Sequence, residues 1–295
     1  MGRRRHSRRR KTRKNAPKHL FKCWGEISER IRRAEHVALF TDFDGTLAAI
    51  RRDPQAVRLA PRVRKLLEEL AKSGITLGVV SGRKIEDVRR HVQLKSIWYG
   101  GAHGLFVRDP QGRTHSLATP EQKARILRTR RLLQESIGGA RGLWIEHKIA
   151  TVALHYRGAP ARSQRIARDA VAKAMERDLH LCLLASKKAW GLLPDGQSDK
   201  WAAVSFIIER ERRRTSARRW LVIFVGDDAT DERVFARMHG LSVAVGKRSR
   251  TAAKYWLRSP GEVRQFLERL KAMRRRDERS TAAHERSGGE ERVSK

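Results

Sequence analysis

The sequence predicts an α/β protein in which a parallel sheet carries an inserted, smaller α+β domain. Two observations predict this fold class. Short apolar runs alternate with helical patterns in the first and last thirds of the chain, as in a parallel sheet with right-handed crossovers. Between these parts, the pattern changes to strands paired around helices. At 295 residues and 39% hydrophobic, the chain can form one large domain or two small ones.

The first part of the parallel sheet begins with the apolar run 37–40, which we expect to be a buried strand. This strand ends at Asp42 and Asp44, after which Gly45 and Thr46 turn the chain. Apolar residues at helical spacing and further apolar runs then predict a helix over 61–72, a strand over 75–80, a helix over 85–92 and a strand over 97–99.

The middle of the chain reads as the inserted domain. Gly138 and Gly139 end its first helix, and Ile166, Ala170 and Val171 lie on one face of its second. Its expected elements are a helix over 121–137, strands over 143–146 and 149–155, a helix over 162–177, and strands over 179–185 and 190–193.

The alternating pattern returns from Asp199 onward. We expect a helix over 201–213, a strand over 220–225, a helix from Asp231, a strand over 241–245, and terminal helices through Tyr255–Trp256 and 263–270. The resulting domains are a basic, largely disordered tail with a lead-in helix over 1–34, a core over 35–110 and 191–273, the insert over 111–190, and a disordered tail over 274–295.

The charge is strongly positive, with 67 Lys and Arg against 32 Asp and Glu and a net charge of +35. Residues 2–14 are mostly basic with no acid, so this segment is expected to be disordered. It predicts non-specific contact with nucleic acid or an anionic surface, although it has no aromatic side chains to stack on bases. Cys23 and Cys182 lie far apart without metal-ligand spacing, and no apolar run suggests a signal peptide or membrane span. We therefore expect a cytoplasmic protein.

Four polar motifs follow predicted strands or begin a helix. They are Asp42-x-Asp44, Ser81, Lys200 and Asp227-Asp228-x-x-Asp231. The carboxyl ends of parallel strands open onto one crevice, so these groups are expected to converge there. A carboxylate can attack phosphorus to form an aspartyl-phosphate, and Mg²⁺ suits a site of carboxylates and waters. Lys200 and Ser81 would hold the phosphoryl oxygens.

Two further residues near these motifs have two interpretations each. His103 lies in the glycine-rich turn 100–104 and either contacts substrate or closes the turn. Arg83, two residues after Ser81, either orients the phosphate loop or meets substrate. We include both among the expected substrate-binding residues.

The motifs Asp42-Phe-Asp-Gly-Thr46, Ser81, Lys200 and Gly226-Asp-Asp-x-x-Asp231 resemble, in order, those of the haloacid dehalogenase (HAD) superfamily of phosphatases. The resemblance implies a doubly wound, HAD-like (Rossmannoid) core with an inserted cap domain. It implies Asp42 as nucleophile and Asp44 as general acid and base. The metal ligands would be Asp42, the main-chain carbonyl of Asp44, and Asp227, with Asp228 and Asp231 supporting the metal from behind.

The segments Gly100-Gly-Ala-His-Gly104 and Ile145-Glu-His-Lys148 are similar to trehalose-6-phosphate phosphatases, and the similarity runs from about residue 35 to 270. It implies a Mg²⁺-dependent hydrolase of trehalose 6-phosphate, in which Glu146 and Lys148 bind glucose hydroxyls. Association with a trehalose-phosphate synthase is a further expectation.

One departure from the family concerns the sugar. Gly191 and Leu193 stand where the family usually has Glu and Arg, just before the motif lysine. This keeps open a different glycosyl or sugar phosphate as substrate. A third hypothesis, a non-catalytic protein that binds nucleic acid or a partner, does not explain why Asp42, Asp44, Lys200 and Asp227 are all present.

Overall fold

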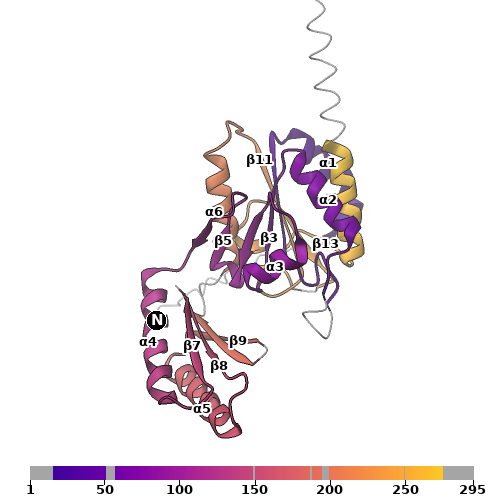
Figure 1. Cartoon of the computed structure of the whole chain (residues 1–295). Coiled ribbons are helices and arrows are strands. Elements are labelled where there is room, and N and C mark those ends of the chain that lie inside the picture. Colours follow the sequence, from indigo (N-terminus) through magenta and orange to yellow (C-terminus); the bar gives the residue numbers. More distant parts are fainter. Residues whose placement is uncertain are drawn as a thin grey trace, which may run out of the picture.

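The computed structural model describes residues 16–50, 57–148, 150–186, 188–194, 199–248 and 250–274. Within these ranges the strands form a nine-stranded sheet and a four-stranded sheet. Figure 1 shows the small sheet with α4 and α5 as a lobe of its own beside the lobe of the large sheet. Of the expected terminal segments over 1–34 and 274–295, residues 1–15 and 275–295 lie outside the described residues.

The large sheet has the order β1-β13-β12-β11-β2-β3-β4-β5-β6. Neighbours from β1 to β4 are parallel, and β5 and β6 add an antiparallel hairpin at one edge. The strands are β1 Lys18–His19, β2 His36–Thr41, β3 Thr76–Val80, β4 Trp98–Gly101, β5 Phe106–Arg108, β6 Thr114–Ser116, β11 Trp220–Gly226, β12 Gly240–Val245 and β13 Tyr255–Leu257.

Helices cover both faces of this sheet. Every residue of β2 after His36 is buried, which is why the strand reads as an apolar run and not as an alternation. Its Val37 and Leu39 pack into one core and its Ala38 and Phe40 into another. The first core includes α1 Trp24–Arg33, α2 Pro61–Lys72, α3 Ile85–Val92 and a helix over 260–274, and the second includes α6 Lys200–Arg212 and α7 Glu232–Arg237.

The small sheet is antiparallel with the order β7-β8-β10-β9. Two helices cover one of its faces and share a core with it. Its elements are β7 Trp144–Lys148, β8 Thr151–His155, β9 Leu181–Ser186, β10 Ala189–Pro194, α4 Pro120–Ile137 and α5 Ala161–Arg177. The helix α4 begins with a capping box in which Thr119 and Gln122 bond each other's main-chain N–H groups.

The predicted fold class, a doubly wound parallel sheet with an inserted α+β unit, is confirmed. The prediction of a helix through Tyr255–Trp256 is wrong, because these residues form β13, which pairs with β12 and β1. A short apolar segment takes its conformation from its neighbours, and here a free sheet edge was available. The change of sheet also falls a few residues from the expected boundaries: β6 still pairs in the large sheet, and β10 runs to Pro194 in the small one.

In the part of the chain that the structure describes, no helix is both long enough and apolar enough to cross a membrane.

Candidate active site

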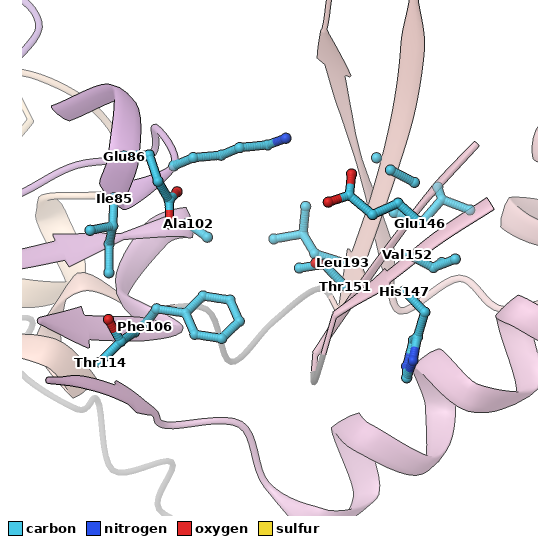
Figure 2. Close-up of a pocket in the computed structure, with 14 residues that line it drawn as sticks. Ile85, Glu86, Ala102, Phe106, Thr114, Glu146, His147, Thr151, Val152 and Leu193 are labelled. Atoms are coloured by element: carbon cyan, nitrogen blue, oxygen red, sulfur yellow. The ribbon is translucent and has the colours of Figure 1, made fainter. Parts of the chain in front are cut away.

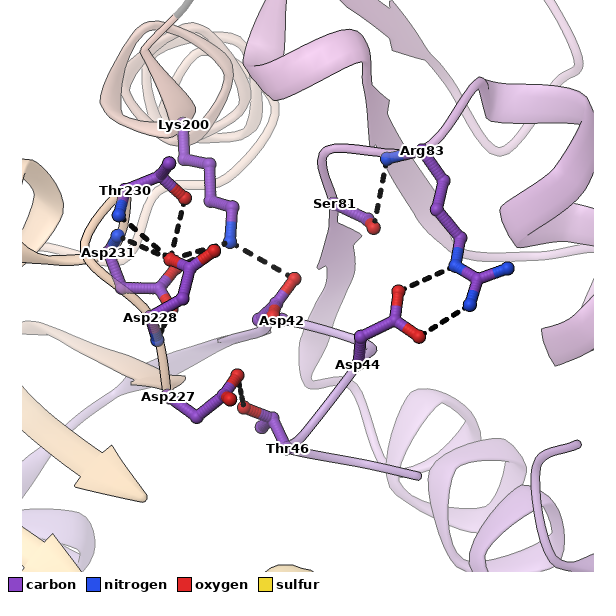
Figure 3. Close-up of polar contacts among 10 residues, drawn as sticks. All are labelled: Asp42, Asp44, Thr46, Ser81, Arg83, Lys200, Asp227, Asp228, Thr230 and Asp231. Atoms are coloured by element: carbon purple, nitrogen blue, oxygen red, sulfur yellow. Dashed lines mark hydrogen bonds and ion pairs between the residues drawn. The ribbon is translucent and has the colours of Figure 1, made fainter. Parts of the chain in front are cut away.

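The carboxyl ends of three neighbouring strands bring the predicted groups to one edge of the large sheet (Figure 3). Asp42 follows β2, Ser81 follows β3, and Asp227 follows β11. The main-chain N–H of Asp42 donates to the carbonyl of Val225 at 2.8 Å, which extends the β2–β11 ladder to the site. Segments from opposite ends of the chain therefore meet at this edge.

Lys200 is the first residue of α6 and lies almost fully buried among three carboxylates. Its Nζ is 2.7 Å from Asp231 Oδ1, 3.1 Å from Asp42 Oδ1 and 3.6 Å from Asp228 Oδ1. Burial opposes the charge of the ammonium group, but the three carboxylates outweigh it and raise the pKa of Lys200. These carboxylate oxygens are close enough together to surround one cation, and the Lys200 ammonium is the cation they surround here.

The loop after β11 is held by its own acids. Asp228 Oδ1 accepts from the N–H and the hydroxyl of Thr230 and from the N–H of Asp231, and the N–H of Asp228 donates to Asp231 Oδ2 at 2.9 Å. A Cβ at Gly226 would lie 2.3 Å from the Asp231 carboxyl carbon, so only glycine fits. These bonds fix Asp231 beneath Lys200, with its side chain fully buried.

Asp42 and Asp227 follow neighbouring strands, and the charge of Asp227 helps to raise the pKa of Asp42. Burial raises the pKa of Asp42 to about 7, although Lys200 lowers it, and burial also raises the pKa of Asp227. The Thr46 hydroxyl donates to Asp227 Oδ1 at 3.2 Å. Gly45 has a φ of +73°, and a Cβ there would meet Asp227 Oδ2 at 2.0 Å. Two carboxylates crowded in this way fit a divalent cation, which would balance their charge.

Asp44 points to the other side of the site, toward Arg83 (Figure 3). Arg83 Nε donates to Asp44 Oδ2 and Arg83 Nη2 to Asp44 Oδ1, both at 2.5 Å, which is a two-point fork. The main-chain N–H of Arg83 donates to Ser81 Oγ at 3.2 Å. The structure thus gives Arg83 a partner within the protein that sequence reasoning did not predict.

His103 lies against the phosphate-loop candidate Ser81–Arg83. A Cβ at Gly82 would lie 2.5 Å from His103 Cε1, so the ring occupies the space that glycine leaves. Ala102 and His103 have φ values of +48° and +55°, a strained region for residues with side chains. Within the described residues, His103 Nδ1 is buried with no hydrogen-bond partner. Backbone strain and an unpaired polar atom together favour a role in ligand contact over simple turn closure.

A cleft of about 520 Å³ lies between the two sheets (Figure 2). The large-sheet lobe contributes Lys84, Ile85, Glu86, Ala102, Phe106 and Thr114, and the small sheet contributes residues of β7, β8 and β10. The cleft is mostly apolar, with Glu146 projecting into it (Figure 2). Asp42 and Lys200 do not line the cleft, but its lining residues Lys84 and Ala102 adjoin Arg83 and His103 in the chain.

The register of the small sheet explains which of its residues line the cleft. Glu146 pairs with Ala153, and Ala153 pairs with Gly191, so the three form one row across β7, β8 and β10. Glu146 also contacts His155 Nε2 at 3.0 Å, and His155 stacks on the exposed ring of Trp144. Gly191 and Leu193 both line the cleft and offer it no polar side chain. The side chain of Lys148 lies outside what the structure describes.

The structure therefore brings Asp42, Lys200, Asp227, Asp228 and Asp231 together and places Asp44, Ser81 and Arg83 beside them. His103 adjoins this group, and Glu146 lies across the cleft. Sequence reasoning missed Phe43 and His91, which pack on Arg83, since nothing in the spacing of these residues marks them. It also missed the cleft-lining Phe106, which belongs to an unpredicted strand.

The parallel sheet with carboxylates at its carboxyl edge and an inserted cap sheet defines a HAD-type protein. In Aspergillus fumigatus, the solved trehalose-6-phosphate phosphatase aligns with a TM-score of 0.57 at 23% identity, over 87% of this chain and 99% of that chain. The C-terminal domain of the Candida albicans trehalose-6-phosphate phosphatase gives 0.57 at 19% identity, over 88% and 99%. At these identities the likeness is one of fold.

The trehalose-phosphatase family model matches residues 40–260, and the chain belongs to this family. The trehalose-phosphate phosphatase of Mycobacterium tuberculosis is 34% identical over 245 residues, which are 80% of this chain and 62% of the relative. The protein of that name in Mycobacterium leprae is 32% identical over 251 residues, 80% of this chain and 58% of the relative. The chain thus spans about three fifths of the length of these relatives. The resemblance seen in the sequence is confirmed at the level of the family.

Proposed function

We propose that this protein is a Mg²⁺-dependent phosphatase that hydrolyses trehalose 6-phosphate to trehalose and phosphate. One observation carries the proposal: the buried Asp42 carboxylate lies 3.1 Å from the Lys200 ammonium at the carboxyl edge of a parallel sheet. A carboxylate held next to a fixed positive charge can approach a dianionic phosphoryl group, which would otherwise repel it. Family membership and the names of the relatives support the choice of substrate.

The residues present suffice for a two-step displacement. One Asp42 oxygen attacks phosphorus, the bond from phosphorus to the sugar oxygen breaks, and that oxygen takes a proton from Asp44. In the second step water attacks the aspartyl-phosphate, its proton passes to Asp44, and phosphate leaves with the Asp42 carboxylate restored. Lys200 and Ser81 would hold the phosphoryl oxygens, and the unpaired Nδ1 of His103 is a further candidate for that contact.

The metal would be held by Asp42, Asp227 and the main-chain carbonyl of Asp44. The position of Asp42 and Asp227 at the ends of neighbouring strands, where the charge of Asp227 acts on Asp42, supports this set. Mg²⁺ bound there would neutralise charge on the phosphoryl oxygens. Asp228 and Asp231 would support the metal site without binding the metal, because their oxygens already accept hydrogen bonds from the loop after β11 and from Lys200.

The cleft supports a second candidate substrate, a different glycosyl or sugar phosphate. Gly191 and Leu193 line the cleft near Glu146 without offering a hydrogen bond to a sugar hydroxyl. A site that hydrogen-bonds a hydroxyl discriminates strongly in its favour, and a missing partner costs about 1–3 kcal/mol. This face of the cleft would therefore distinguish sugars by shape more than by hydrogen bonding.

A panel of sugar phosphates assayed with the full chain and Mg²⁺ tests both candidates. We expect trehalose 6-phosphate to have the highest kcat/KM, and faster turnover of another sugar phosphate would select the second candidate. Asp42→Asn should abolish phosphate release while circular dichroism shows the fold retained. Unchanged turnover by this variant would remove Asp42 as nucleophile.

The remaining expectations stay predictions. The cytoplasmic location and association with a trehalose-phosphate synthase rest on the sequence and the family alone. Contact of the basic segment 2–14 with nucleic acid or an anionic surface concerns residues outside the described ranges.

A further inference from the structure

Arg83 donates two hydrogen bonds to the Asp44 carboxylate, and this paired geometry fixes how the carboxylate is oriented. Both Asp44 oxygens accept from one guanidinium at 2.5 Å, so the plane of the carboxylate is set by Arg83. Asp44 is only two residues from Asp42, yet its carboxylate turns away from the Lys200 cluster (Figure 3). A lysine could supply the same charge but not the same two-point geometry.

The guanidinium of Arg83 is itself held by two side chains, His91 and Phe43, that have no other evident task at the site. His91 Nε2 lies 3.4 Å from Arg83 Nη1, and the guanidinium carbon lies 5.5 Å from the centre of the Phe43 ring. Phe43 is fully buried and stacks on His91 at 5.8 Å between ring centres. The main-chain N–H of Arg83 is bonded to Ser81. The guanidinium is thus held by His91 and Phe43, and the main chain of Arg83 is held by Ser81, as is needed for a group that positions another.

The imidazole of His91 is suited to this support. It is nearly buried, and burial together with the charges of Arg83 and Arg58 lowers its pKa. A neutral ring has one nitrogen that accepts a hydrogen bond, so it can support a guanidinium that it would repel when charged.

The fork also lies where the catalytic edge meets the cleft. Lys84 and Ile85, the residues directly after Arg83, line the cleft, whereas Asp42 and Lys200 do not. A sugar in the cleft with its phosphate on Asp42 would have its leaving oxygen between these two regions. Asp44 must then be protonated at a lone-pair position that Arg83 does not use, with this proton facing the leaving oxygen when the bond to phosphorus breaks.

We propose that Arg83 is a positioning residue that orients the Asp44 carboxyl group toward the leaving oxygen, with His91 and Phe43 holding the guanidinium. This inference rests on the proposed phosphatase function. It adds a third role to the two expected from the sequence, in which Arg83 orients the phosphate loop or meets substrate. The loss of Arg83 would impair proton delivery to the leaving oxygen and leave attack by Asp42 less affected.

The test compares two substrates that differ in one atom: trehalose 6-phosphate and its analogue with sulfur in place of the bridging oxygen. A thiolate leaves without a proton, so hydrolysis of the analogue does not require an oriented acid. For Arg83→Lys and Arg83→Met, we expect the ratio of kcat/KM for the oxygen ester to kcat/KM for the phosphorothiolate analogue to fall about tenfold or more, with KM little changed. His91→Phe, which keeps the ring stack and removes the nitrogens, should lower the ratio by a smaller factor.

Arg90→Lys is the matched control, since Arg90 is an exposed arginine on the following helix, paired with Asp87. Its ratio should equal that of the wild type. An equal loss of both activities in the Arg83 variants would overturn the inference, as would a raised KM with an unchanged ratio. If Arg83 variants do not fold, an unchanged ratio in His91→Phe overturns it. If the wild type hydrolyses neither compound, the failure lies with the proposed function instead.

Discussion

At the scale of single residues, Lys200 and its three carboxylate partners compensate one another's charge, so removing any one of them should destabilise the others. Lys200 is 1% exposed and touches three carboxylates, two of which are buried. Burying any of these charges alone would cost several kcal/mol, and they are tolerated because each compensates another. The start of α6 positions Lys200, and the loop after β11 positions the carboxylates that compensate its charge.

Lys200→Met should therefore destabilise the protein by about 3–5 kcal/mol, because the buried carboxylates of Asp42 and Asp231 would lose their positive counter-charge. Urea unfolding followed by circular dichroism measures this loss. The control is Lys72→Met, which removes an exposed lysine paired with Glu68 and should change stability little. Similar stability of the two variants would contradict this account of the cluster.

The residue-level site was only partly predictable from sequence. Asp42, Ser81 and Asp227 follow buried strands, and a parallel sheet places such residues at one edge, so their approach could be foreseen. The pairing of Asp44 with Arg83 could not, because it depends on side-chain directions in two loops. His91 reads as an ordinary helix residue, and its contact with Arg83 arises only when α3 packs beside Phe43.

At the scale of elements, the β5–β6 hairpin extends the sheet toward the cleft and depends on one buried acid. The Asp109 side chain accepts from Arg113 N at 2.8 Å, Arg113 Nε at 2.9 Å and His115 Nε2 at 3.2 Å. Burial raises the pKa of Asp109, but these hydrogen bonds outweigh it and lower the pKa to about 2. The hairpin carries Phe106 and Thr114, which line the cleft.

Asp109→Asn should cost about 1–3 kcal/mol at neutral pH, because charge-assisted bonds to a buried carboxylate are lost. The folded pKa lies below the unfolded value of 3.8, so the contribution of the carboxylate is complete above about pH 4 and disappears as pH falls toward 2. Denaturant unfolding of both proteins at several pH values measures this. A stability difference that persisted at pH 2 would show that the charge is not its source.

The elements that sequence reasoning found are those with strong local patterns. Fully buried strands such as β2 and β11 read as continuous apolar runs, and α2 shows clear helical spacing. The strands that the sequence analysis missed within the described residues are β1, β5, β6 and β13, which have two or three residues each and lie at or near sheet edges. Such short strands have no periodicity of their own, and the neighbouring strand decides their conformation.

At the scale of the whole molecule, the two lobes face each other across the cleft, and under the proposed function the fit of the substrate would depend on side chains from both. The large-sheet lobe supplies Phe106 and Ile85, and the small sheet supplies the row Glu146, Ala153 and Gly191. The missing side chain at Gly191 leaves volume in this row. Under the proposed function, binding of the sugar and chemistry at phosphorus would fall to different parts of the molecule.

Gly191→Leu should raise KM for trehalose 6-phosphate about tenfold by filling the cleft, because shape mismatch in a pocket costs about 1–3 kcal/mol. Turnover of p-nitrophenyl phosphate, which is too small to need the whole cleft, should change much less. Gly25→Leu is the control, since Gly25 lies on α1 with open space around it. Equal KM values for the wild type and Gly191→Leu would place the sugar elsewhere.

The strand order of the large sheet has a consequence for how the protein is made. The apolar strand β2 lies between β3 and β11, and β11 is encoded far downstream. While a ribosome is still translating the intervening segment, one edge of β2 has no partner, and exposed apolar edges of this kind invite aggregation. We expect nascent chains that end before β11 to depend on chaperones and to be degraded rapidly if released, so that catalytic competence and resistance to proteolysis arrive together, late in synthesis.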